Sequence, residues 1–139
     1  MKKLLLITVL VTLFFGCKKN NSIPGDQLEG RWEYRGTACY CAYPNGVPNN
    51  KAGNGDIYLF ADGNYKHMQN GQVVKSGTYT ISADVLNGQA VSRITYDGVT
   101  TPTNGFSLPF FKITDGTKLT FFGTVPAASD GVEMYYERL

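Results

Sequence analysis

Short runs rich in aromatic and β-branched residues, separated by turn dipeptides, extend from residue 56 to the end of the chain. The dipeptides are Asp-Gly or Asn-Gly, at residues 62–63, 70–71, 87–88, 97–98, 115–116 and 130–131. They supply the positive φ angles that tight hairpin turns require. The runs between them, each expected to form a strand, are DIYLFA, NYKHMQ, QVVKSGTYTI, QAVSRITY, FSLPFFKI, KLTFFG and VEMYYERL. This pattern predicts a series of antiparallel strands joined mainly by local hairpins.

A further strand is predicted ahead of this series, over residues 28–35. In the segment LEGRWEYR, small, apolar or aromatic residues occupy every second position and charged residues the positions between them. This period of two is typical of a strand with one buried and one solvated face. The residues from Thr37 to Gly55 are rich in Pro, Asn and Gly and are predicted to form a long loop, a kind of segment that is often functional. Pro109, inside FSLPFFKI, indicates a bulge or strand end at that point.

The strand pattern defines the expected fold class. After residue 17, no ten-residue stretch repeats its apolar positions with the 3.6-residue period of a helix. Because no helix is available to cover a sheet edge, the strands can protect their edges by closing on themselves. The chain is therefore predicted to be all-β, an antiparallel eight-stranded up-and-down barrel. An immunoglobulin-like sandwich is the rival fold, but the chain lacks the Cys…Trp…Cys spacing typical of it.

The N-terminus has the pattern of an export signal. After Met-Lys-Lys, the segment Leu4–Phe15 is an uncharged apolar run of 12 residues. A membrane-spanning helix needs roughly 20 such residues, so this run has the length of a signal-peptide core. It ends in LFFGC, which resembles the lipobox of bacterial lipoproteins and implies cleavage after Gly16 and a diacylglycerol on Cys17. The alternative is a plain secretory signal with an incidental cysteine.

These features divide the chain into three parts. We expect a lipoprotein signal peptide at residues 1–16, a lipid anchor and flexible polar tether at residues 17–27, and the barrel at residues 28–139. A flexible tether of this length spans roughly 15–20 Å root-mean-square, enough to lift a domain off a bilayer. The residue directly after the anchor cysteine is Lys18, and in this the chain resembles lipoproteins that are sorted to the outer membrane. The domain is expected on either the periplasmic or the cell-surface face of that membrane.

The charge of the chain changes once the signal peptide is removed. Without Lys2 and Lys3, the 13 Lys and Arg residues fall to 11, against 11 Asp and Glu. A nearly neutral domain with no basic block beyond Lys18 and Lys19 is not expected to bind nucleic acid. The expected partners are therefore the membrane, through the lipid anchor, and a small apolar ligand or an envelope protein.

The segment Gly30-Arg31-Trp32 resembles the Gly-x-Trp motif on the first strand of lipocalins. Lipocalins also carry an Arg near the last strand that packs against this Trp, and the resemblance assigns that role to Arg138. On this reading Trp32 and Arg138 close one end of the barrel, and Met134 and Tyr136 point inward with Arg138. The Thr-Asp-Tyr motif of typical lipocalins is absent, so the resemblance is to a shorter lipocalin-like barrel, as found on small bacterial outer-membrane lipoproteins.

Candidate chemistry is sparse. The single histidine, His67, lies in a predicted strand beside a turn and is expected to be a half-exposed strand residue rather than a general base. No Gly-x-Ser-x-Gly motif occurs, and most carboxylates occupy turn positions. We therefore expect no catalytic residues, no cofactor, no metal site and no enzyme activity. Cys39 and Cys41 form either a disulfide or a pair of free thiols, since export permits disulfides.

The long loop is the predicted binding surface. Cysteines two residues apart in a regular strand have Cα atoms about 6.6 Å apart, near the upper limit of disulfide geometry. A Cys39–Cys41 bond therefore requires a locally bent chain, which would present Tyr40 and Tyr43 on a rigid corner. The alternative is a flexible loop with two free thiols.

The aromatic content leaves two functions open. Large rings are expected to fill most of the barrel, at Trp32, Tyr34, Phe60, Tyr65, Tyr79, Phe121 and Tyr136. The first function is a lipid-anchored envelope protein that binds a small apolar molecule at the barrel mouth or a partner on its loops. The alternative is a structural or interaction module of an envelope complex without a ligand cavity.

Overall fold

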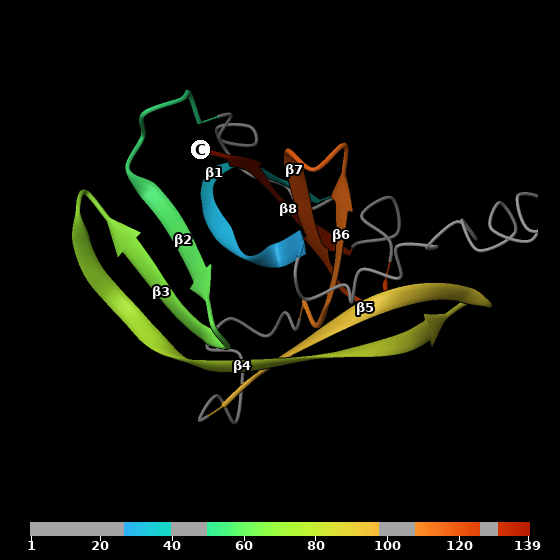
Figure 1. The fold of residues 1–139 in the computed structure, drawn as a ribbon. Coiled ribbons are helices and arrows are strands. Elements are labelled where there is room, and N and C mark those ends of the chain that lie inside the picture. Colours follow the sequence, from blue (N-terminus) through green and yellow to red (C-terminus); the bar gives the residue numbers. More distant parts are fainter. Residues whose placement is uncertain (1–26, 40–49, 98–107, 126–130) are drawn as a thin grey trace, which may run out of the picture.

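Eight antiparallel strands form a closed barrel in the computed structural model, which describes residues 27–39, 50–97, 108–125 and 131–139 (Figure 1). Their bounds are β1 (Gly30–Cys39), β2 (Asp56–Ala61), β3 (Asn64–Gln69), β4 (Gln72–Leu86), β5 (Gln89–Tyr96), β6 (Phe110–Thr114), β7 (Lys118–Phe122) and β8 (Val132–Arg138). Each strand pairs with its neighbours in sequence, and β1 pairs with β8 to close the ring. The predicted fold class, an all-β antiparallel eight-stranded up-and-down barrel, is confirmed.

The turn dipeptides have the backbone conformation that the sequence predicts. Asp62, Asn70, Asn87 and Asp115 have positive φ angles between 49° and 54°, and the glycines that follow them have φ angles between 67° and 81°. Asp and Asn tolerate this conformation better than other residues with a side chain, and glycine adopts it freely. Residues 62–63, 70–71 and 87–88 are therefore two-residue hairpin connections between successive strands.

The bounds of three strands differ from the sequence prediction by more than one residue. β1 begins at Gly30 rather than residue 28 and continues to Cys39, because a register shift at Gly36 lets it keep pairing with β8. The first three residues of the predicted loop at 37–55 are therefore strand. β4 runs to Leu86 because its second half pairs with β5, and Figure 1 shows this hairpin projecting from the barrel. β6 begins at Phe110, directly after Pro109, which confirms the strand boundary expected at the proline.

Aromatic side chains fill much of the lumen. The buried core consists of Leu28, Trp32, Phe60, Tyr65, Tyr79, Ile94, Phe111, Leu119, Phe121 and Tyr136. All seven rings expected in the lumen belong to this core or, in the case of Tyr34, pack against it. Burying a large apolar side chain contributes about 1.5–3 kcal/mol, so this cluster is the main source of stability.

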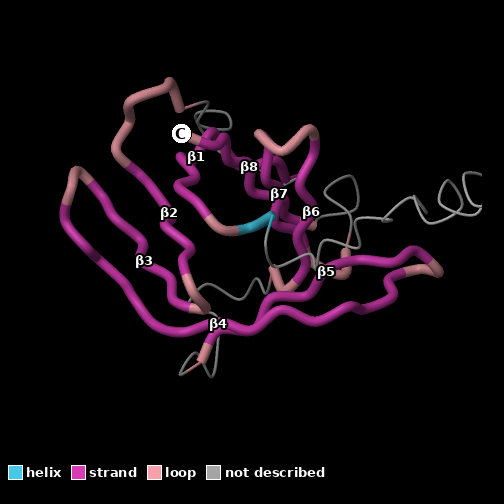
Figure 2. The backbone as a smooth tube through the Cα atoms, viewed as in Figure 1, coloured by secondary structure: helices cyan, strands magenta, loops and turns pink. Residues whose placement is uncertain are grey.

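One end of the barrel is closed where β1 begins and β8 ends. The Arg138 guanidinium carbon lies 4.3 Å from the centroid of the Trp32 ring, so the expected contact is present. Arg138 also donates to three carbonyl oxygens, of Glu29 at 2.8 Å, Gln27 at 2.5 Å and Gly116 at 2.7 Å. Figure 2 shows the short helical turn at residues 27–28 within the outline of the strands.

The Trp32 indole completes this closure. Its Nε1 donates to the Leu28 carbonyl at 2.7 Å, which holds Leu28 in the lumen with no exposed surface. We call this arrangement of Leu28, Trp32 and Arg138 the closed end. Within the described part of the chain, no helix is long and apolar enough to cross a membrane. The predicted signal peptide, Cys17 and the tether up to residue 26 lie outside the described residues.

Candidate functional site

Polar side chains face the lumen on the side of the barrel away from the closed end. Strand register places Tyr58 of β2 directly opposite His67 of β3, so both side chains point to the same face of the sheet. Their rings stack at a centroid distance of 4.4 Å and an interplanar angle of 3°. Tyr58 also meets the edge of Tyr136 of β8, at 5.7 Å and 85°. The lumen is thus bridged by rings from β2, β3 and β8.

An acid and an imidazole lie beside these rings. His67 Nε2 is 2.8 Å from Asp56 Oδ1, and Gln69 Nε2 donates to Asp56 Oδ2 at 3.4 Å. The His67 side chain is 18% exposed and the Asp56 side chain 30% exposed. The prediction that His67 is a strand residue beside a turn is confirmed, but its ring is packed against Tyr58 rather than projecting freely.

Three further tyrosines complete the group. Tyr34 packs against Tyr136 at 5.4 Å, and Tyr65 packs against Tyr96 at 4.8 Å. We use the name lumen cluster for these inward-facing residues, which are Tyr34, Asp56, Tyr58, Tyr65, His67, Tyr96 and Tyr136.

Several hydroxyls of the lumen cluster have no partner in the described part of the chain. Tyr34 bonds Thr37 Oγ1 at 2.5 Å, and Tyr136 donates to Met134 Sδ at 3.8 Å. The hydroxyls of Tyr58, Tyr65 and Tyr96 form no hydrogen bond to any protein atom there.

These unpartnered hydroxyls are accessible. Among the described residues, no buried side-chain polar atom lacks a hydrogen-bond partner. A hydroxyl without a partner must therefore have surface that is accessible to solvent. Tyr65 is the clearest case, because the residue as a whole is only 2% exposed. Its hydroxyl consequently keeps accessible surface, which a water molecule or a ligand atom can contact.

A glycine makes room for Tyr65. Gly77 of β4 lies opposite Tyr65, and a Cβ atom at Gly77 would come within 3.0 Å of the Tyr65 ring. An aromatic ring packed over a cross-strand glycine is fixed in place by the bare backbone beneath it. The position of the Tyr65 hydroxyl is thus set by the absence of a side chain on the neighbouring strand.

Four tyrosines of the lumen cluster, Tyr58, Tyr65, Tyr96 and Tyr136, have raised pKa values and stay neutral over the physiological range. Burial, with smaller effects from Tyr65 and Asp56, raises the pKa of Tyr58 to about 12. Burial raises the pKa values of Tyr96 and Tyr136 well above 10, and other tyrosines of the cluster add to the effect. Their hydroxyls therefore act as neutral hydrogen-bond donors and acceptors.

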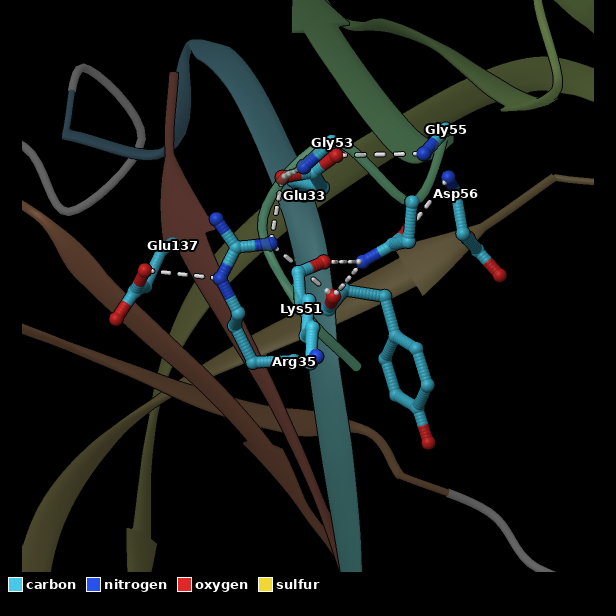
Figure 3. A network of polar contacts seen from close by, with 9 residues as sticks. Glu33, Arg35, Lys51, Gly53, Gly55, Asp56 and Glu137 are labelled. Atoms are coloured by element: carbon cyan, nitrogen blue, oxygen red, sulfur yellow. Dashed lines mark hydrogen bonds and ion pairs between the residues drawn. The ribbon is translucent and has the colours of Figure 1, made fainter. Parts of the chain in front are cut away.

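A network on the outer face of β1 holds the segment that leads into Asp56 (Figure 3). Glu33 is only 2% exposed, and its carboxylate accepts hydrogen bonds from the Gly53 and Gly55 amides at 3.0 and 3.3 Å. Arg35 Nη1 donates to the same carboxylate at 2.5 Å, and Arg35 Nε donates to Glu137 of β8 at 2.8 Å. We call these five residues the Glu33 strap.

The Glu33 strap has consequences for charge and position. Burial alone would raise the pKa of Glu33, but the hydrogen bonds from Arg35 and the two glycine amides outweigh it and lower that pKa. Asn54, between the two glycines, accepts a hydrogen bond from the Asp56 amide at 2.8 Å. The Glu33 strap and Asn54 thereby position Asp56, the carboxylate of the lumen cluster.

The sequence prediction missed this network. Glu33 reads as one of the solvated charges of an alternating strand, and nothing local marks it as buried. The sequence signal that could have found it is the Gly53-Asn54-Gly55 segment, whose φ values of 80° and 76° at the glycines turn the amides toward Glu33.

The predicted binding loop lies partly outside the described residues. Tyr40, Cys41 and Tyr43 lie outside the described residues, as does Cys17. Cys39 is the last residue of β1, so its backbone is strand rather than loop. The Cys39–Cys41 disulfide and the binding role of Tyr40 and Tyr43 remain predictions. In the described ranges, no group of three or more His, Cys, Asp or Glu residues is arranged to hold a metal ion.

Comparison of the chain with protein-family models, curated proteins and solved structures found no match.

Proposed function

We propose that this chain is a lipid-anchored binding protein of the bacterial cell envelope, with a lipocalin-like barrel that takes a small ligand into the lumen cluster. The observation that carries the ligand site is the set of accessible, unpartnered hydroxyls of Tyr58, Tyr65 and Tyr96 inside an otherwise aromatic lumen. A small-molecule site of this kind joins apolar walls to a few placed polar groups. The proposed anchor rests on the lipobox-like LFFGC, and the proposed outer-membrane location on Lys18.

The geometry of the barrel supports entry from one side. The closed end is sealed by Leu28, Trp32 and Arg138, so a ligand would enter from the opposite end, where β1 ends and β2 begins. Asp56 and His67 lie at that end and are partly exposed. They would be the first polar groups that a ligand meets.

The alternative function is an interaction module of an envelope complex with no ligand. The observation that favours it is the extent of ring packing, since Tyr58 alone contacts Phe60, Tyr65, His67 and Tyr136. A lumen filled by its own rings would leave the barrel as a rigid platform for loops. The two functions differ in whether a molecule occupies the lumen.

A lumen-filling variant tests the proposed function. The Gly77→Val substitution places methyl groups against the Tyr65 ring, whereas Ser76→Val adds similar bulk to the neighbouring, exposed position of β4. Native mass spectrometry of the protein purified from membranes is expected to show a bound small molecule. That molecule should be lost in Gly77→Val and retained in Ser76→Val. If wild-type protein carries no small molecule, the interaction module replaces the binding protein.

A further inference from the structure

Arg35, Arg93 and Arg138 have their partners away from the lumen cluster. Arg35 belongs to the Glu33 strap on the outer face, and Arg138 lies on Trp32 at the closed end. Arg93 pairs with Asp84 at 2.6 Å and lies over Phe110. Lys75 of β4 is the basic residue whose register position, opposite His67, faces the cluster, but it is exposed to solvent.

The charge that the lumen cluster offers a ligand is therefore negative or zero. Asp56 supplies a carboxylate, and His67, which it contacts, is the neighbouring titratable group. The tyrosine rings present electron-rich faces, which attract organic cations. Their hydroxyl oxygens can accept hydrogen bonds from an ammonium group.

We infer that the lumen cluster binds a small organic cation, an amine or quaternary ammonium compound with an apolar body. This inference rests on the proposed function and adds the charge class of the ligand. The cationic group would lie against Asp56 and the Tyr58 ring, and the apolar body would pack among the inner rings. An anion would meet the Asp56 carboxylate without a buried arginine to compensate it.

Asp56 would present its carboxylate to the cation through Oδ2. Its Oδ1 lies 2.8 Å from His67 Nε2, whereas Oδ2 accepts a longer hydrogen bond from Gln69, at 3.4 Å. A cationic group that replaces this long contact would gain a closer, charged one.

Three probes with the same ring and different charges test the inference. Isothermal titration calorimetry on the full lipidated chain in a neutral detergent would compare benzyltrimethylammonium, benzyl alcohol and benzylsulfonate. The cation should bind at least about ten-fold more tightly than the other two probes, because one partly screened charge contact contributes about that much affinity. Asp56→Asn should remove that preference, whereas Asp62→Asn, in an exposed turn beside the closed end, should keep it.

A second measurement guards against a variant that fails to fold. In the wild-type protein, affinity for benzyltrimethylammonium should fall several-fold between about 0.05 M and about 0.5 M NaCl, because salt screens a charge contact, whereas affinity for benzyl alcohol should change little. Equal affinity for all three probes, a preference for benzylsulfonate, or no binding of any probe would overturn the inference. A neutral or anionic molecule found by native mass spectrometry would do the same and leave the proposed function standing.

Discussion

At the scale of single residues, three glycines each have a structural role that involves one particular neighbouring side chain. Gly30 has a φ of 131°, and a Cβ there would lie 2.7 Å from Arg138 Nη1. Gly30 therefore cannot carry a side chain without displacing Arg138, which covers the Trp32 ring. Gly77 instead accommodates the Tyr65 ring, and Gly53 turns an amide toward Glu33.

Gly30→Ala is predicted to destabilise the closed end. A side chain at this φ is strained by about 1–3 kcal/mol, and the clash with Arg138 adds to it. The matched control is Gly88→Ala, at a φ of 77° with no atom within 4 Å of the added Cβ. Urea unfolding followed by Trp32 fluorescence should show a larger loss of unfolding free energy for Gly30→Ala. Equal losses would mean that the Arg138 contact does not constrain this position.

At the scale of elements, the barrel is organised by what each strand has on its two faces. β1 carries Trp32 and Tyr34 toward the lumen and Glu33 outward, yet Glu33 is buried because residues 50–55 fold back over it. This contact ties the segment before β2 to β1, and Arg35 extends the tie to β8. The strap thus joins three neighbouring strands on the outside of the ring, while the rings join them on the inside.

Glu33→Gln is predicted to weaken the barrel in a pH-dependent manner. Removing a buried, hydrogen-bonded charge costs about 1–3 kcal/mol at pH 7. The folded pKa of Glu33 lies below the ordinary value of 4.5, so its stabilisation is complete above pH 4.5 and is lost as pH falls toward the folded pKa.

The difference in unfolding free energy between wild type and Glu33→Gln should therefore shrink from pH 7 to pH 3.5. Urea denaturation at both pH values checks this. Glu29→Gln, at an exposed carboxylate, is the control and should change stability by less than Glu33→Gln. A gap that stays constant with pH would show that the Glu33 charge does not stabilise the strap.

At the scale of the whole molecule, the barrel has two unlike ends. The closed end holds the turns at residues 62–63 and 115–117 and the Trp32–Arg138 contact. The other end holds the entry to β2, the turn at 70–71 and the partly exposed Asp56–His67 pair. Because the chain reaches Gln27 at the closed end, a lipid anchor at Cys17 would tether the barrel from that side and leave the Asp56–His67 pair facing away.

Cys17→Ser is predicted to release the protein from the membrane or leave it unprocessed. Cys17 is the proposed site of the diacylglycerol, and several acyl chains, each gaining about 0.8 kcal/mol per buried CH₂, form a stable anchor. Fractionation and immunoblotting of whole cells check this, with Ser22→Ala in the tether as a control that should stay on the membrane. A Cys17→Ser protein that is cleaved and still membrane-bound would place the anchor elsewhere.

The local features of the fold could be predicted from the sequence because they depend on neighbouring residues. Asp-Gly and Asn-Gly dipeptides favour positive φ by themselves, and alternation along a strand assigns its two faces without reference to any partner. The closed end was also predictable, but only because the Gly-Arg-Trp segment resembles that of lipocalins.

Only the tertiary structure decided the burial of Glu33, the stacking of His67 on Tyr58 and the packing together of tyrosine rings from five strands. These contacts depend on register and on the stagger of the strands around the ring, which set which residues meet across the lumen. Glu33 and Gly53 lie 20 positions apart, and Arg35 and Glu137 lie 102 apart. Local preferences carry no information about such pairs. The sequence thus determined the strands, the turns and their faces, whereas closure of the barrel determined the site.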